Sequence, residues 1–265
     1  MMETQNQPPE PTPQPTKNSN LKWIVLAVGG GIVLIACIAV LAALAVAYFA
    51  PMFRKSSSAN SGNPNIATQV TTSPQSQVLN VVMPPVRDHP QANGNKMGDP
   101  NAPVKIIEYA DFQCTYCLRY WTDTEQQIIE NYVATGKVYY EYRSVGGFIG
   151  PESADAANAA YCAADQNKFW EYHDTLFANW TGENAGDFTP DRLRQYAAAI
   201  HLNLDQFNTC LNSGAHTAQV SQDVSDAKTA GVQGTPAFFI NGKLVEGAEP
   251  YSVFQQTIDA ALNGQ

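Results

Sequence analysis

Positive charge is scarce in this sequence. Its 265 residues include 15 Lys and Arg against 24 Asp and Glu, which gives a formal net charge of −9. The imbalance lies in the C-terminal part, because 9 basic residues stand against 20 acidic ones from Pro100 onward. A domain this acidic repels phosphate backbones, so we expect no nucleic-acid partner.

Cysteine and histidine are also few, which bears on metal binding. Of five cysteines, only Cys114 and Cys117 form a closely spaced pair, and the four histidines form no motif. A structural zinc site usually has four ligands in two close pairs, so we expect no metal ion, and no cofactor is expected either.

Cys37 lies apart from the other four cysteines, in an apolar segment. The other four cysteines could form two disulfides, which would indicate an oxidising compartment.

Charge is absent altogether from the long apolar run Trp23–Phe53. This run exceeds the roughly 20 residues that cross a bilayer core, and aromatic residues stand near both of its ends. We therefore predict a transmembrane anchor over residues 21–53, in which Cys37 is an inert thiol. Two alternatives stay open, a signal peptide cleaved after Ala45–Ala47 and a lipoprotein box at Leu34–Cys37.

Polar sequence flanks the predicted anchor on both sides. Residues 1–20 have almost no large apolar groups and are predicted to be a disordered tail. Residues 54–98 are rich in Ser, Asn, Pro and Gln and are predicted to be a flexible linker. Within it, the short apolar run Val78–Met83 is a candidate edge strand. Two basic residues flank each end of the anchor, so the positive-inside rule leaves its orientation open.

Residues 99–265 have the composition of a mixed α/β domain. The expected helices are one at Thr115–Ala134, several within residues 151–230, and a last one at Pro250–Leu262. The expected strands are Val104–Ala110, Lys137–Arg143, Pro236–Ile240 and, after the Asn241–Gly242 hairpin signal, Lys243–Gly247. The order is therefore strand, helix, strand, a helical block, a hairpin of two strands and a helix.

The position of the cysteine pair favours redox chemistry over a structural role. A disulfide between Cys114 and Cys117 closes so short a loop that it constrains little of the unfolded chain. After a strand and at the start of a helix, Cys114 meets free N–H groups and the positive end of the helix dipole, which favour a thiolate. Cys117, one turn further on, can attack a mixed disulfide on Cys114. The pattern predicts a redox pair.

Glu108 precedes Cys114 by six residues, on a strand that is expected to be buried. One interpretation is a carboxyl group beneath the cysteines, with a raised pKa, that exchanges a proton with Cys117. The alternative is a strand end that faces solvent. Further along, Pro236 opens a strand, a position that proline can occupy, although local rules alone favour a trans bond before it.

Four separate motifs, in order, carry a resemblance to a known family: "DPNAPVKIIEYADFQCTYC", "KFWEYHDTLFANW", "GVQGTPAFFINGK" and "YSVFQQTIDAAL". Over about residues 98–262 the chain resembles DsbA-like thioredoxin-fold proteins. The resemblance implies an α/β thioredoxin fold with an inserted helical subdomain at about residues 150–230, here preceded by one transmembrane helix.

The resemblance also implies roles for individual residues. Cys114 would be the nucleophile and Cys117 the resolving cysteine, with Glu108 as the carboxylate before the motif. Pro236 would follow a cis bond, and Thr235 would present its backbone to an extended substrate peptide.

Other residues near the motif are expected to complete the substrate site. Thr115 and Tyr116 stand where the best-known oxidases of the family carry Pro-His, which removes one stabiliser of the thiolate. Phe112, Tyr116 and Phe148 are candidates for an apolar rim, of which at least one is expected to be core instead.

Cys162 and Cys210 each lie in a predicted helix of the insertion. In an oxidising compartment, and by likeness to similar proteins, we expect them to form a disulfide. Two buried thiols are the alternative.

Together these features predict a single-pass protein of a bacterial cell membrane whose C-terminal domain lies outside the cytoplasm. Its function would be a thiol–disulfide oxidoreductase that introduces disulfides into exported proteins. The expected partners are reduced, unfolded exported proteins and a membrane quinone-linked thiol oxidase that reoxidises the pair. A reductase or isomerase that uses the same cysteines is one alternative, and a non-catalytic thioredoxin-fold binding or chaperone module is another.

Overall fold

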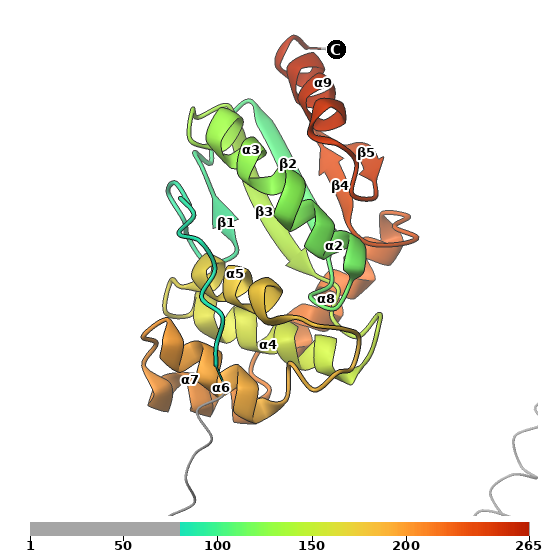
Figure 1. Ribbon diagram of the computed structural model, residues 1–265. Helices are drawn as coiled ribbons and strands as arrows, with labels where there is room; N and C mark the ends of the chain where they lie inside the picture. The colour runs from blue at the N-terminus through green and yellow to red at the C-terminus, as the bar shows by residue number, and fades with distance from the viewer. Residues whose placement is uncertain (1–79, 265) are drawn as a thin grey trace, which may run out of the picture. The chain divides into compact units, whose positions relative to one another are not determined.

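A mixed sheet of five strands forms the centre of the computed structural model, which describes residues 80–264 (Figure 1). The strand order is β1-β3-β2-β4-β5, with β2 and β3 parallel and the other neighbours antiparallel. The strands are β1 (Lys96–Met97), β2 (Val104–Ala110), β3 (Val138–Ser144), β4 (Ala237–Ile240) and β5 (Lys243–Glu246).

The central strand β2 is buried along most of its length. It pairs with β3 on one edge and β4 on the other, and only Lys105 of its seven residues is exposed. In β3, by contrast, buried residues alternate strictly with half-buried ones, as expected of a strand with one face against the core. A polar side chain on β2 is therefore enclosed in the domain, which becomes important for Glu108.

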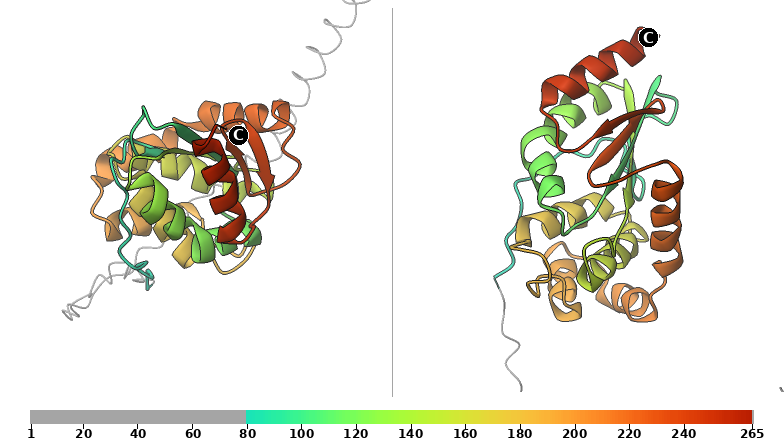
Figure 2. Two further views of the ribbon diagram at one scale, coloured as in Figure 1. Left: turned by 90° about the horizontal axis from the view of Figure 1, so that it is seen from above. Right: turned by 90° about the vertical axis from the view of Figure 1, so that its right-hand side faces the viewer.

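A continuous helical stretch follows β2 and lies on one face of the sheet together with α9. It comprises α2 (Thr115–Tyr120), the π-helical turn η2 (Trp121–Glu125), α3 (Gln126–Ile128) and the second π-helical turn η3 (Ile129–Val133). The helix α9 (Tyr251–Leu262) packs against α3, β2 and β4. Figure 2 shows α2 and α3 in green and α9 in red on one face of the sheet, with α8 in orange on the other.

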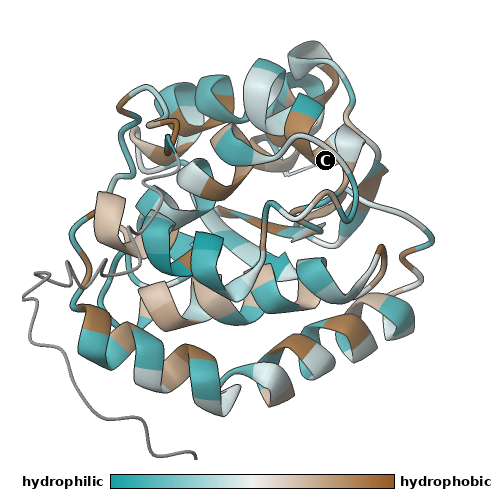
Figure 3. Ribbon diagram, turned by 60° about the horizontal axis from the view of Figure 1, so that its bottom comes forward, coloured by the Kyte–Doolittle hydropathy of each residue, from teal (hydrophilic) through white to brown (hydrophobic). Residues whose placement is uncertain are grey.

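Five helices form the insertion between β3 and β4: α4 (Pro151–Ala164), α5 (Phe169–Asn179), α6 (Pro190–Ala199), α7 (Leu204–Ser213) and α8 (Thr217–Thr229). Hydrophobic and hydrophilic residues alternate along several of these helices (Figure 3), as expected of helices with one buried face. Cys162 of α4 and Cys210 of α7 form a disulfide, so they are not the two buried thiols of the alternative. The predicted thioredoxin-like fold with a helical insertion is confirmed.

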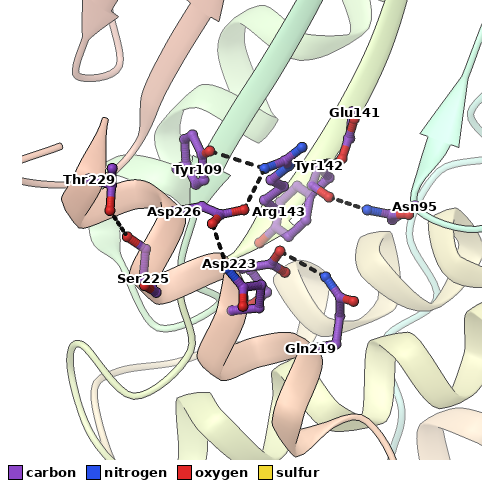
Figure 4. A network of polar contacts seen from close by, with 12 residues as sticks. Asn95, Tyr109, Glu141, Tyr142, Arg143, Gln219, Asp223, Ser225, Asp226 and Thr229 are labelled. Carbon is purple, nitrogen blue, oxygen red and sulfur yellow. Dashed lines mark hydrogen bonds and ion pairs between the residues drawn. The ribbon is translucent and has the colours of Figure 1, made fainter. Parts of the chain in front are cut away.

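Polar contacts attach the last helix of the insertion to the sheet (Figure 4). Arg143 of β3 donates to Asp226 of α8 at 3.0 Å and to the Tyr109 hydroxyl of β2 at 3.3 Å. In α8, Asp223 accepts hydrogen bonds from Tyr161 of α4 and from Gln219. These contacts fix α8 directly before the chain re-enters the sheet at β4.

Aromatic side chains join the sheet and the insertion in one core. Phe112, just after β2, stacks on Tyr142 of β3 and packs against Phe177 of α5, each with ring centroids 5.3 Å apart. Trp170 of α5 packs edge-on against Tyr140 of β3. Each such pair adds to the burial of apolar area, so the position of the insertion is set by contacts with the sheet.

The segment before β2 lies against the domain, although residues up to 98 were predicted to be linker. β1 pairs with β3, with Lys96 opposite Glu141 and Met97 opposite Tyr140. The expected edge strand at Val78–Met83 does not form among its described residues, 80–83. Val82 instead exchanges hydrogen bonds with the side chain of Asn179 in α5. Pro84 and Pro85 follow directly, and they lack the N–H groups that would continue a strand.

Within residues 80–264, no helix combines the length and the apolar character needed to cross a membrane. The predicted anchor at 21–53 lies outside the described residues, as do the predicted tail and residues 54–79.

Candidate active site

The two cysteines of the motif sit where β2 gives way to the helical stretch. Cys114 has an extended backbone and directly precedes the first helical residue of α2, which brings the backbone N–H groups of Tyr116 and Cys117 near its sulfur. Cys117 lies one turn further on and is 1% exposed, against 7% for Cys114. Both are free thiols. Cys114 is therefore the more accessible sulfur of the pair.

The surroundings of the two sulfurs separate their pKa values. A hydrogen bond from the Cys117 thiol is the largest influence on Cys114 and, with the Thr235 side chain and the N–H groups of Tyr116 and Cys117, lowers its pKa to about 6 against the effect of burial. Burial is the largest influence on Cys117 and, with its hydrogen bond to Cys114, raises the pKa of Cys117 well above the ordinary value. At neutral pH the pair therefore holds one thiolate, on Cys114, and one thiol.

The loop before β4 completes the surroundings of Cys114. The Thr235–Pro236 bond is cis, as the resemblance implied. Cys114 Sγ lies 3.3 Å from the Thr235 carbonyl oxygen, across 121 residues of sequence, and donates to it when the thiol is protonated. The structure thus brings together Cys114, Cys117, Thr235 and Pro236.

Glu108 is 2% exposed, which excludes the alternative of a strand end in solvent. The Tyr140 hydroxyl donates to Glu108 Oε2 at 2.7 Å and lies 3.0 Å from the Tyr120 hydroxyl. Burial is the dominant cause that raises the pKa of Glu108 to about 8, and the hydrogen bond from Tyr140 opposes it. A negative charge on Glu108 would raise the pKa of Cys117, so the two groups sense each other's protonation.

Thr115 and Tyr116 are both exposed, next to Cys114. Tyr116 is 56% exposed with the Arg119 guanidinium 5.0 Å from its ring centroid, and Phe148 is 39% exposed. Phe112 is fully buried and belongs to the core, because it packs against Tyr142 of β3 and Phe177 of α5. The assignment of Phe112 to the rim was therefore wrong, and Phe112 is the core residue expected among the three, while Tyr116 and Phe148 present apolar surface.

Asp111 was not singled out from the sequence, although it lies three residues before Cys114. It is fully buried, and burial raises its pKa to about 6. Its Oδ1 accepts the Gln113 N–H at 2.8 Å and so shapes the turn that precedes the helix. One feature of the sequence could have identified Asp111: it is an acidic residue in the turn directly before the cysteine that starts the helix.

Two groups of potential metal ligands occur among residues 80–264. Cys162, Cys210 and His216 form one, but both of its sulfurs are joined in the disulfide. Glu125, His173 and Asp174 form the other group, which is buried. The guanidinium of Arg87, 3.2 Å from Glu125, compensates negative charge in this group. Neither group was identified from the sequence.

A low-pKa cysteine at a helix start, a buried partner cysteine and a cis-proline loop, on a thioredoxin fold with a helical insertion, define the class of DsbA-like thiol–disulfide oxidoreductases. The family model described as Thioredoxin matches residues 91–260. The chain belongs to the DsbA-like thioredoxin-fold family.

The chain is similar in sequence to two kinds of known protein. The chain is 30% identical to a probable disulfide bond formation protein D of Bacillus cereus over 171 residues, 63% of this chain and 77% of the relative. It is 36% identical to a Na(+)/H(+) antiporter NhaA 3 of Salinispora tropica over 185 residues, 69% of this chain. The matched part spans only 26% of that antiporter, about a quarter of its length.

A similar solved structure is α-DsbA1 of Wolbachia pipientis. It aligns with a TM-score of 0.57 and 28% identity, over 66% of this chain and 94% of that one.

Proposed function

We propose that this chain is a membrane-anchored, extracytoplasmic thiol–disulfide oxidoreductase that introduces disulfides into exported proteins through Cys114 and Cys117. The observation that carries the proposal is the unequal protonation of the pair, with the pKa of Cys114 at about 6 and that of Cys117 raised. A binding module would need neither cysteine in this state.

The reaction begins with the oxidised pair. A substrate thiolate attacks Sγ of Cys114, the Cys114–Cys117 bond breaks, and Cys117 leaves as a thiolate that takes the proton of Glu108. A second substrate thiolate then attacks the substrate sulfur of the mixed disulfide. The disulfide of the substrate forms, and Cys114 leaves as a thiolate. Two electrons have passed from substrate to enzyme, and a membrane quinone-linked thiol oxidase accepts them in the next step.

The low pKa of Cys114 favours this direction. A pKa of about 6 instead of 9 stabilises the reduced state by about 1.4 kcal/mol at pH 7, or about 30 mV for a two-electron couple. A stable thiolate is also a good leaving group in the second step. The magnitude is modest, in keeping with the absence of the His that the best-known oxidases carry between their cysteines.

Substrate binding is proposed at the surface around Cys114. An extended peptide would pair with the backbone of Thr235, next to Pro236, as an added strand. Thr115 and Tyr116, which follow Cys114 directly, would contact its side chains, because both are exposed. Phe148 would contribute as well, since it is exposed and its neighbour Ile149 donates a backbone hydrogen bond to Asp111, in the turn before Cys114. Glu108, enclosed beneath, would not contact substrate.

Location outside the cytoplasm is supported by the disulfide between Cys162 and Cys210 and by the apolar run Trp23–Phe53. Sodium–proton exchange is not proposed, because the likeness to the antiporters concerns only about a quarter of their length.

The reduction potential of the full-length protein tests the proposal. We expect a value above that of thioredoxin, about −270 mV, and rapid oxidation of a reduced, unfolded substrate by the oxidised protein. Cys114→Ser should abolish oxidation. A potential near or below that of thioredoxin, with rapid reduction of substrate disulfides, would favour the reductase alternative.

A further inference from the structure

Two polar side chains lie beside the disulfide of the insertion. His216 directly precedes α8, Asp165 stands at the end of α4, and His216 Nε2 lies 2.9 Å from Asp165 Oδ2. The same carboxylate oxygen lies 3.6 Å from Sγ of Cys210. The disulfide is therefore next to a histidine and a carboxylate, both of which bind zinc in proteins together with cysteine.

The ligand atoms are close enough for one metal ion. A ring nitrogen of His216 and the sulfurs of Cys162 and Cys210 all lie within 4.8 Å of one another. In a tetrahedral site with Zn–S bonds of about 2.3 Å and Zn–N bonds of about 2.0 Å, neighbouring ligand atoms are roughly 3.3–3.8 Å apart. Small side-chain rotations therefore suffice to place an ion among these atoms once the sulfur–sulfur bond is open.

The fold holds His216 in place independently of the disulfide. Its N–H donates to Asn158 Oδ1 of α4 at 2.9 Å, and its ring packs against Tyr161 of α4 with ring centroids 5.8 Å apart. The helix α4 packs against both α7 and α8. These contacts keep the imidazole beside both sulfurs when the cysteines are reduced.

Solvent reaches one side of this group. The side chains of His216 and Asp165 are 26% and 42% exposed, and Cys210 is only partly buried. A hydrated ion can therefore approach from the side of the histidine and the carboxylate. The four residues come from α4, α7 and the start of α8, so their spacing along the chain matches no zinc motif. This is why the sequence alone predicted no metal ion.

We propose that Cys162, Cys210, His216 and Asp165 form a zinc site when the two cysteines are reduced, so that the insertion is closed either by a disulfide or by a metal ion. Both cysteines are synthesised as thiols, so the site precedes the disulfide. A small dithiol restores it by giving two electrons to the disulfide and becoming a disulfide itself. The inference does not depend on the proposed function.

The two closed forms exclude each other. Binding of Zn²⁺ releases the two thiol protons, because the ion binds thiolates. Oxidation by another disulfide then removes two electrons from the two sulfurs, forms the bond between them and releases Zn²⁺. The metal ion should therefore compete with formation of the disulfide.

Cobalt tests the site, because the absorption of bound Co²⁺ reports thiolate ligands and tetrahedral geometry. The full-length Cys114→Ser/Cys117→Ser variant is used, so that the redox pair supplies no ligand. After reduction by a phosphine without oxygen, and removal of the phosphine, we expect charge-transfer bands from thiolate and the visible bands of a tetrahedral site. They should reach a plateau at one ion per chain and disappear on addition of Zn²⁺. The oxidised form, which keeps the Cys37 thiol, should give neither.

Single variants in the same background separate the four-ligand site from binding by two thiolates alone. His216→Asn and Asp165→Asn should each weaken Co²⁺ binding by about tenfold or more, since loss of even an outer partner of a ligand costs that much. Cys210→Ser should remove tight binding. His201→Asn replaces an exposed histidine between α6 and α7 and should change nothing.

The competition with oxidation gives an independent readout. With Zn²⁺ at ten times its dissociation constant, oxidised glutathione should form the disulfide between Cys162 and Cys210 about tenfold more slowly, because only the unbound thiols react. Peptide mapping measures this rate, and the same Zn²⁺ concentration should have much less effect in His216→Asn. Three results would overturn the proposal: no cobalt bands in the reduced protein, bands of unchanged affinity in both His216→Asn and Asp165→Asn, or equal oxidation rates with and without Zn²⁺.

Discussion

At the scale of single residues, the chemistry of the site depends on the difference in pKa between two cysteines one helical turn apart. Cys114 gains hydrogen bonds from Cys117, from Thr235 and from the first N–H groups of α2, whereas Cys117 is enclosed and gains little that favours a charge. Desolvation alone would raise both pKa values. The hydrogen bonds at the helix start therefore favour Cys114 as the nucleophile of the proposed reaction.

This difference predicts selective alkylation. Because only the thiolate reacts, the labelling rate of Cys114 in the reduced protein should rise with pH and reach half of its plateau near pH 6. Cys117 should stay unlabelled through the neutral range. Mass spectrometry of peptides after brief exposure to iodoacetamide at each pH gives both rates.

Cys117→Ala provides the matched control for Cys114. It removes the hydrogen bond that contributes most to the low pKa, so the midpoint of Cys114 should move upward. Faster labelling of Cys117 in the wild type, or a midpoint for Cys114 at the ordinary cysteine value of about 8.5, would contradict the assignment.

The pKa of Glu108 likewise depends on the surroundings of its carboxyl group. Its raised pKa follows from burial between β3 and β4 on the central strand, and the Tyr140 hydroxyl is its one hydrogen-bonding neighbour among residues 80–264. A carboxyl group that is half protonated near pH 8 can give or take a proton under neutral conditions.

At the scale of elements, the insertion is held by covalent and polar links at different helices. The disulfide joins α4 to α7, while Arg143 joins β3 to α8 through Asp226. The cysteine pair of the site lies at the start of α2, and within residues 80–264 no disulfide links that helix to the insertion. Stability and chemistry should therefore be separable by mutation.

The double variant Cys162→Ala/Cys210→Ala tests this separation. The two residues are 48 apart in sequence, and opening a loop of that length costs about 4 kcal/mol in the chain-entropy model, with measured losses often smaller. We expect a lower free energy of unfolding in urea and an unchanged pH midpoint for Cys114 labelling. A loss of the low midpoint in the folded variant would show that the disulfide also shapes the redox site.

At the scale of the whole molecule, the question is on which side of the membrane the proposed anchor places the domain. The bacterial cytoplasm would keep both Cys162–Cys210 and the proposed redox pair Cys114–Cys117 in the reduced state. The proposed anchor at 21–53 therefore has to place residues 80–264 outside.

Protease added to bacterial cells without their cell wall tests this orientation. The domain should be digested while a cytoplasmic marker protein stays intact, and residues 1–20 should be protected. Protection of the domain until the membrane is broken would show the opposite topology.

Local sequence determined the chemistry and most of the element order. The spacing of Cys114 and Cys117, the β-rich run before them and the turn signals before β5 depend on neighbouring residues, so they can be read without knowing the fold. The helical block and the final helix follow from the same short-range patterns. The redox pair and the α/β class were therefore predictable from the sequence.

Tertiary structure decided which side chains lose contact with water, and with which partners. Burial placed Phe112 in the core and Glu108 beneath the cysteines, and it joined Arg87 to Glu125 across 38 residues of sequence. No local pattern contains these outcomes, because desolvation and pairing arise between segments that only folding brings together. The sequence by itself thus specifies a pair of cysteines able to exchange disulfides, whereas the packing around them sets where their protons lie.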